Sequence, residues 1–463
     1  MLNDAPLIIN RSQNKKSWAS SANLIILAFS TVFYMRIICS LTPAPSILTH
    51  AHFIVVPLVF SIVLTTAKMK DPQQIKLVRS LLLGLFLFAI AILLSAFWNE
   101  TGLINGVVSF MMLGEPMMFL TAIACIPLSF ESFSRIKKWF LWSALINFVL
   151  AAIQKPLIDS GKLYANGHDG TDGSGGVFFI SGAGNYVSAS VSVAVAIYFL
   201  ANEKTFPLWF RISVFLASFW QVLFSDSKQI VFAYAVAWML IILFASEDVG
   251  QSIKLLIGIV VLGLVFYWCV QNVEAFKPYT AWARPELYGP DGEAWYAKFY
   301  SVRVIISEFE SPLNWLFGLG PGHTVSRLGA WFLQDYSAIL APLGATTSYI
   351  GVDAREFVQN FWLTFGSSMF SPIFGWAGIW GDLGSLGLGT YLFLDYLVWR
   401  NFGLDNSLKL TLLAILVFGF IFTQMEEPGY MLSVALMLGI AWQEKRLKIQ
   451  QNQQLMEEYN YNV

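Results

Sequence analysis

Residues 80–98 read SLLLGLFLFAIAILLSAFW and contain no charged side chain. A helix needs about 20 predominantly apolar residues to cross the hydrocarbon core of a bilayer. The stretch has nearly this length, and it lies between the polar residues Arg79 and Asn99. It therefore predicts a membrane-spanning helix.

The composition of the whole chain favours the same environment. Its 463 residues are 56% hydrophobic, 16% aromatic and 12% charged, with a mean hydropathy of +0.61. Soluble domains carry roughly a quarter charged residues, so this chain lacks the polar groups to cover a water-facing surface. Soluble globular, disordered and disulfide-scaffold classes are excluded. The net charge of −1 gives no indication of a nucleic-acid partner.

Repeated apolar stretches predict an all-α polytopic membrane protein with about 12 transmembrane helices. The predicted spans are 22–42, 51–67, 80–98, 104–129, 139–156, 177–201, 207–224, 229–246, 253–270, 382–399, 408–424 and 430–444. The chain then divides into a cytoplasmic N-terminal segment (1–21), nine helices (22–270), one long extracytoplasmic loop (271–381), three helices (382–444) and a cytoplasmic tail (445–463). Most of the 28 basic residues fall in the segments that this orientation places in the cytoplasm.

The long loop at 271–381 is crowded with Trp, Tyr and Phe. Loops of this length are uncommon and usually functional. Apolar residues at helical spacing predict amphipathic helices over 293–310 and over 353–370, the second with Asp353 as its N-cap. We expect such helices to lie along the membrane surface.

Basic residues on the predicted outer side are candidates for holding phosphate groups. They are Arg36, Lys228, Arg303, Arg327 and Arg355, which together could surround one outer-facing cavity. A local ion pair is the alternative for two of them. Arg303 shares a helix face with Glu310, and Arg355 could pair with Asp353 or Glu356.

Several residues are candidates for accepting a proton from a substrate hydroxyl. They are Glu310, His323, Asp353 and Asp382. Glu115 precedes Pro116 within a predicted span, where an ionisable residue is a functional candidate by default. The run from His168 to Gly173 is either a flexible turn or a cation loop. No metal-binding motif is found, and no cofactor is expected.

Three local patterns point to a family. The first is Phe224-Ser225-Asp226-Ser227-Lys228. The second is Arg303 followed by Leu316-Phe317-Gly318-Leu319-Gly320-Pro321-Gly322, and the third is Gly381-Asp382-Leu383-Gly384-Ser385-Leu386-Gly387. In order and spacing they resemble the O-antigen polymerase and O-antigen ligase superfamily of bacterial membrane glycosyltransferases.

The resemblance implies a metal-independent polysaccharide polymerase of the bacterial plasma membrane. It would transfer a glycan from polyprenyl diphosphate to a lipid-linked repeat unit on the outer face, for O-antigen, capsule or exopolysaccharide. Arg303 would be the main diphosphate ligand. The partners would be the lipid-linked oligosaccharide, the bilayer and other polysaccharide assembly proteins, such as a chain-length regulator or a flippase.

Two alternatives stay open. Family ligases carry a His where this chain has Phe370, which favours polymerase over an O-antigen or protein O-oligosaccharide ligase. The more distant alternative is a polysaccharide transporter or flippase. Its inverted repeats and paired broken helices are not apparent in this sequence.

Overall fold

The computed structural model describes residues 21–163, 173–179, 183–245, 249–273, 280, 284–289 and 291–461. Every regular element in these ranges is a helix, and they contain no strand. The predicted all-α class is therefore confirmed. The segment before residue 21 and the run from His168 to Asp172 lie outside the described residues.

Five described helices are long and apolar enough to cross a membrane. They are Ser46–Thr66 (η1 Ser46–His50 with α3 His52–Thr66), α4 (Pro72–Trp98), α5 (Leu103–Cys125), α6 (Phe130–Asp159) and α7 (Gly184–Asn202). A sixth span results if α1 (Ser21–Phe33) and α2 (Met35–Leu41), which are bent by 52°, count together. The chain is thus a candidate membrane protein, while the number of twelve spans stays a prediction.

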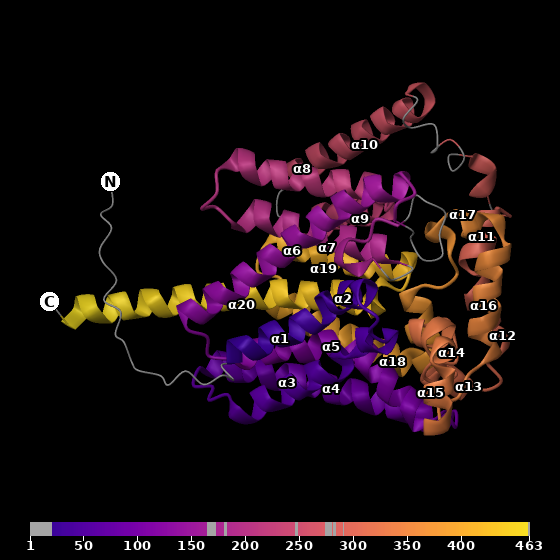
Figure 1. Ribbon diagram of the computed structural model, residues 1–463, viewed down its shortest axis with the longest axis horizontal. Helices are drawn as coiled ribbons and strands as arrows, with labels where there is room; N and C mark the ends of the chain where they lie inside the picture. The colour runs from indigo at the N-terminus through magenta and orange to yellow at the C-terminus, as the bar shows by residue number, and fades with distance from the viewer. Residues whose placement is uncertain are drawn as a thin grey trace.

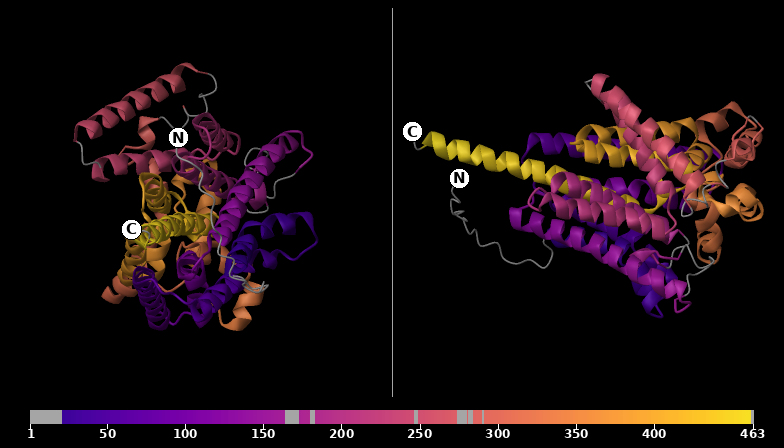
Figure 2. Two further views of the ribbon diagram at one scale, coloured as in Figure 1. Left: turned by 90° about the vertical axis from the view of Figure 1, so that its left-hand side faces the viewer. Right: turned by 90° about the horizontal axis from the view of Figure 1, so that it is seen from above.

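The remaining long helices lie beside these spans (Figure 1). They are α8 (Leu208–Phe224), α9 (Gln229–Ala245), α10 (Val249–Asn272), α18 (Gly375–Phe402), α19 (Asn406–Ile421) and α20 (Pro428–Tyr461). Within the bundle α20 packs on α5, α18 on α4, and α19 on α9. The C-terminal part of α20 projects from one end of the bundle (Figures 1 and 2).

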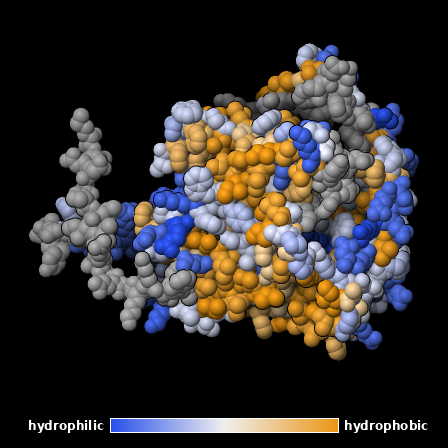
Figure 3. All heavy atoms as spheres, in the orientation of Figure 1, coloured by the Kyte–Doolittle hydropathy of each residue, from blue (hydrophilic) through white to orange (hydrophobic). Residues whose placement is uncertain are grey.

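The surface shown in Figure 3 has the pattern expected of a protein that sits in a bilayer. Hydrophobic residues dominate the middle of this face, and hydrophilic residues gather toward its two ends. Large apolar side chains that are exposed include those of Phe86, Phe97 and Trp142. A water-facing surface would not expose apolar groups on this scale.

The predicted outer loop is folded into short helices at the other end of the bundle (Figure 1). They are α11 (Glu293–Lys298), α12 (Tyr300–Ser307), α13 (Pro312–Phe317), η5 (Leu328–Phe332), α14 (Leu333–Asp335), α15 (Ser337–Leu340), η6 (Ala341–Leu343), α16 (Tyr349–Asn360), α17 (Trp362–Gly366) and η7 (Ser368–Phe370). The helix predicted over 293–310 is two helices that break at Phe299 and end at Ser307, so Glu310 lies beyond them.

The helix predicted over 353–370 was wrong in its boundaries. It begins at Tyr349, because the Ser348 side chain accepts a hydrogen bond from the Ile350 backbone N–H and caps it. Asp353 is therefore inside the helix and is not its N-cap. Extended backbone at Phe361 ends the helix.

The helix expected from residue 382 begins earlier than the sequence indicated. It was expected at 382, whereas α18 starts at Gly375 and is kinked at Gly384, where φ is 64°. A Cβ atom at Gly384 would lie 2.4 Å from the Leu316 carbonyl group, so glycine is required at this position. The segment around Leu316 and Gly318 passes directly over this kink.

Candidate functional site

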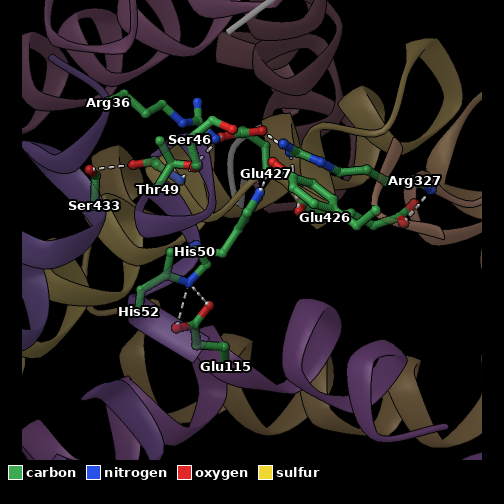
Figure 4. Close-up of polar contacts among 12 residues, drawn as sticks. Arg36, Ser46, Thr49, His50, His52, Glu115, Arg327, Glu426, Glu427 and Ser433 are labelled. Atoms are coloured by element: carbon green, nitrogen blue, oxygen red, sulfur yellow. Dashed lines mark hydrogen bonds and ion pairs between the residues drawn. The ribbon is translucent and has the colours of Figure 1, made fainter. Parts of the chain in front are cut away.

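Seven ionisable side chains from distant parts of the chain lie close together (Figure 4). This buried charge cluster consists of Arg36, His50, His52, Glu115, Arg327, Glu426 and Glu427. Four members lie within residues 36–115 and two are residues 426 and 427. The seventh, Arg327, comes from the segment of short helices before α18. A cluster of this kind within a membrane bundle is a functional candidate, because burying charge there is costly.

Glu427 holds the two arginines of the cluster together. Its Oε1 accepts a hydrogen bond of 2.5 Å from the Arg36 guanidinium, and its Oε2 forms an ion pair with Arg327. The Arg36 side chain is 8% exposed and that of Arg327 is 22% exposed. Two positive charges thus share one carboxylate, and Arg327 offers the more accessible edge.

Local sequence explains why this carboxylate stands here. Glu427 directly precedes Pro428, the first residue of α20, and proline is well suited to the first helical position. The backbone N–H of Gly429 donates to Glu427 Oε1 at 3.4 Å. A negative charge at a helix N-terminus is favoured by the helix dipole. The bend between α1 and α2 occurs beside Arg36.

Glu426 lies next to the two ion pairs of Glu427, and its carboxylate makes a different set of contacts. Its Oε2 accepts the Arg327 backbone N–H at 2.7 Å, whereas its Oε1 is buried without a partner in the described part of the chain. Burial raises the pKa of Glu426 to about 8. A cavity of about 10 Å³, the size of one water molecule, is lined by Glu426, Ser109, Ser326 and Asp382 among others.

This pKa gives a testable pH dependence of stability. Because the folded pKa of about 8 exceeds the ordinary value of 4.5, the proton on Glu426 stabilises the fold at low pH. That contribution is lost as pH rises from 4.5 to about 8, by up to about 1.4 kcal/mol per pH unit, and the loss is complete above 8. Glu426→Gln should match the wild-type melting temperature near pH 5 and exceed it near pH 8. Parallel melting curves at all pH values would contradict this assignment.

Two histidines extend the cluster toward α5. His52 Nδ1 lies 2.9 Å from both carboxylate oxygens of Glu115, and both side chains are fully buried. Pro116 follows Glu115 and lies inside α5. His50 Nε2 lies 3.0 Å from the Tyr336 hydroxyl, and the rings of His50 and His52 are 6.1 Å apart. The cluster thus forms a polar path from the outer segment into the bundle.

The structure brings together two of the five predicted phosphate ligands, Arg36 and Arg327. The other three are engaged elsewhere. Arg303 stacks 4.5 Å above the Tyr296 ring and donates to its carbonyl oxygen at 2.8 Å. Arg355 pairs with Asp335 at 3.2 Å, and Lys228 pairs with Asp226 at 2.7 Å. One cavity lined by all five cations was expected, and it is not formed.

Asp382 has a different role from the predicted one. Its carboxylate accepts four hydrogen bonds of 2.6–2.8 Å, from the backbone N–H groups of Gly322 and Thr324 and from the hydroxyls of Thr324 and Ser326. In the same place the Gly320 N–H donates to the Asp382 carbonyl oxygen. The two glycine-rich motifs are therefore joined by Asp382, which positions the loop that leads to Arg327.

The other predicted proton acceptors also lie outside the cluster. His323 Nε2 lies 2.8 Å from the Thr346 hydroxyl, and burial lowers the pKa of His323. Asp353 accepts a hydrogen bond of 2.7 Å from the Tyr300 hydroxyl. Glu310 is exposed. None of these three side chains contacts the two clustered arginines among the interactions of the described residues.

Sequence reasoning missed Glu426 and Glu427. The available signal was the pair of acidic residues immediately before Pro428, between two apolar stretches. Acidic residues at such a boundary are ordinarily interpreted as a solvated loop. Only the fold shows that this turn points into the bundle beside Arg36.

Comparison with protein-family models and with curated proteins finds no match to this chain. What can be said of its function therefore depends on the chemistry of the buried charge cluster.

Proposed function

We propose that this protein is a membrane glycosyltransferase that polymerises polysaccharide repeat units from a polyprenyl-diphosphate-linked donor. The observation that carries the proposal is the pair of arginines, Arg36 and Arg327, held on one carboxylate at the outer end of the bundle. Planar guanidinium groups are the preferred ligands of phosphate oxygens. A donor anchored in the bilayer would reach this depth with its diphosphate.

The reaction requires that the negative charge on the leaving diphosphate be stabilised. The acceptor hydroxyl attacks the anomeric carbon of the donor sugar, and its proton passes to the departing diphosphate. The bond from that carbon to the diphosphate oxygen breaks, and the electron pair leaves with the diphosphate. Arg36 and Arg327 would stabilise the charge that develops there, which is a large contribution in a site that excludes water.

Glu427 would act as the exchangeable counter-ion of this site. Without donor it forms an ion pair with each arginine, so neither guanidinium is buried unpaired. The incoming diphosphate would take over the interaction with Arg327, whose side chain is the more exposed. Glu426 would help to hold the loop through its bond to the Arg327 backbone.

The proposal differs from the expectation that Arg303 is the main diphosphate ligand. Arg303 lies on an exposed face of α12 and stacks on Tyr296. We therefore propose Arg36 and Arg327 as the diphosphate ligands and keep Arg303 as a comparison. Its substitution by alanine should leave long-chain glycan within about threefold of wild type. Complete loss of long chains in that variant would return the diphosphate site to α12.

Gel analysis of surface and lipid-linked glycans from a deletion strain tests the activity. Single repeat units in place of long chains would support a polymerase. Long chains retained on the lipid carrier would mean a ligase. Repeat units trapped on the cytoplasmic face would mean a flippase and would overturn the proposal. Complementation with the wild-type chain is the control.

A further inference from the structure

A second cavity lies among the long helices of the bundle. It is a groove of about 340 Å³ lined by residues of α5, α18, α19 and α20. Its walls include Leu392 and Tyr396 of α18, Leu413 and Leu416 of α19, Pro116 of α5 and Met431 of α20. Leu392 and Tyr396 are 43% and 52% exposed, so the groove opens on the lipid-facing surface. A hydrocarbon chain matches these apolar walls.

Both helices at the mouth of the groove carry a basic residue at one end. On α18 Arg400 follows Tyr396 by four residues, a turn of about 40°, which places Arg400 beyond the end of the groove at the edge of its face. On α19 Lys409 precedes Leu413 by four residues and therefore shares that face. These ends point to the side of the bundle that the distribution of Lys and Arg predicts to be cytoplasmic.

The two cations are available for an external anion. Neither Arg400 nor Lys409 forms an ion pair with another described residue. The nearest acid in sequence, Asp405, uses its carboxylate to accept hydrogen bonds from the backbone of Ser407 and Leu408 at the start of α19. Two cations at the end of an apolar groove are complementary to an anionic lipid head group.

Asp395 adds a third polar feature inside the groove. It lines the cavity, and its Oδ2 is buried with no hydrogen-bond partner among the described residues. A purely hydrocarbon occupant would leave this carboxyl unsatisfied, which is costly. Asp395 lies five residues before Arg400, about 7.5 Å along the helix and about 140° around its axis, so the two side chains reach the groove from opposite edges. A phospholipid presents its glycerol ester at about this position below its phosphate, and a carboxyl that carries its proton can donate to an ester carbonyl.

We propose that this groove binds an anionic glycerophospholipid from the leaflet on the predicted cytoplasmic side. The phosphate lies between Arg400 and Lys409, an ester carbonyl meets Asp395, and one acyl chain follows the groove toward Met431. The site is separate from the buried charge cluster and does not depend on the proposed reaction. The polyprenyl donor would present its phosphates at the opposite end of the bundle.

Native mass spectrometry of the purified full chain tests the site with dioleoyl phosphatidylglycerol and, as a charge control, dioleoyl phosphatidylcholine. We expect one phosphatidylglycerol to be retained at least tenfold more strongly than phosphatidylcholine. The double variant Arg400→Gln, Lys409→Gln should lose this preference. The matched control Lys76→Gln, Arg79→Gln removes two exposed cations from the start of α4 and should keep it. Equal binding of both lipids, or an unchanged preference in the groove variant, would overturn the site.

A second variant separates the groove from the cations at its end. Leu416→Trp fills the groove and leaves both cations in place, so phosphatidylglycerol retention should fall at least tenfold while the melting profile shows a folded protein. Undiminished retention in this variant would mean binding to surface charge alone. Displacement of the lipid by a polyprenyl phosphate, with no effect of the two basic residues, would mean a donor-chain site. Either result would overturn the proposal.

Discussion

Substitution of Asp382 by alanine is expected to lower the free energy of unfolding by about 3–4 kcal/mol. The change removes all four hydrogen bonds that the carboxylate accepts and leaves the buried N–H groups of Gly322 and Thr324 without a partner. Thermal melting in detergent measures the effect. Because the loop that Asp382 holds leads directly to Arg327, long-chain glycan should be lost in the same variant.

A matched control is provided by Asp405, which also accepts several short bonds. It caps α19 at the other end of the bundle, so Asp405→Ala should cost only about 1 kcal/mol. Asp382→Asn keeps one acceptor oxygen and should fall between these two variants. If Asp382→Ala melts no lower than Asp405→Ala, Asp382 does not anchor the glycine-rich loop in the way described.

Replacement of Arg327 by glutamine is expected to abolish long-chain glycan while the protein still folds. Arg36 remains paired with Glu427 in this variant, so no buried carboxylate is left without a counter-ion. Loss of one preorganised group that stabilises developing charge costs about 10²–10³ in rate. Gel analysis of glycan length in the complemented deletion strain measures the outcome, and a melting curve reports folding.

The controls for this prediction use another arginine of the outer segment. Arg355 forms one half-exposed ion pair with Asp335, and Arg355→Gln should leave chain length unchanged. Arg327→Lys keeps the charge but loses the planar fork, so partial activity is expected. Normal chain length in a folded Arg327→Gln variant would exclude Arg327 from the diphosphate site.

The helical class follows from local properties and could be predicted. Apolar stretches such as 80–98 fall within long helices of the structure, here α4, whose start is fixed by Asp71 and Pro72. Boundaries in the outer segment were less predictable. The helix over 349–360 is capped by Ser348 rather than by Asp353. Serine and aspartate are both good caps by residue type, so the sequence alone did not distinguish the two positions.

The candidate site was predictable only in part. Arg36 and Arg327 were identified as cations in unusual positions, and the structure places both on Glu427. Arg303 carried equal or greater weight in sequence, yet it stacks on an exposed tyrosine. Charge and residue type identify candidate site residues. Which of these residues contact one another depends on packing between parts of the chain that are hundreds of positions apart in sequence.

The sequence by itself determined that the chain is helical and rich enough in apolar residues for a membrane, because hydropathy and helix capping act over a few neighbouring residues. Tertiary structure alone decided that the acidic turn before Pro428 faces Arg36, which lies 391 residues earlier. It also decided that Asp382 joins two glycine-rich motifs, and that α18 and α19 leave a groove between them. These arrangements arise from packing between distant helices, which no local pattern encodes.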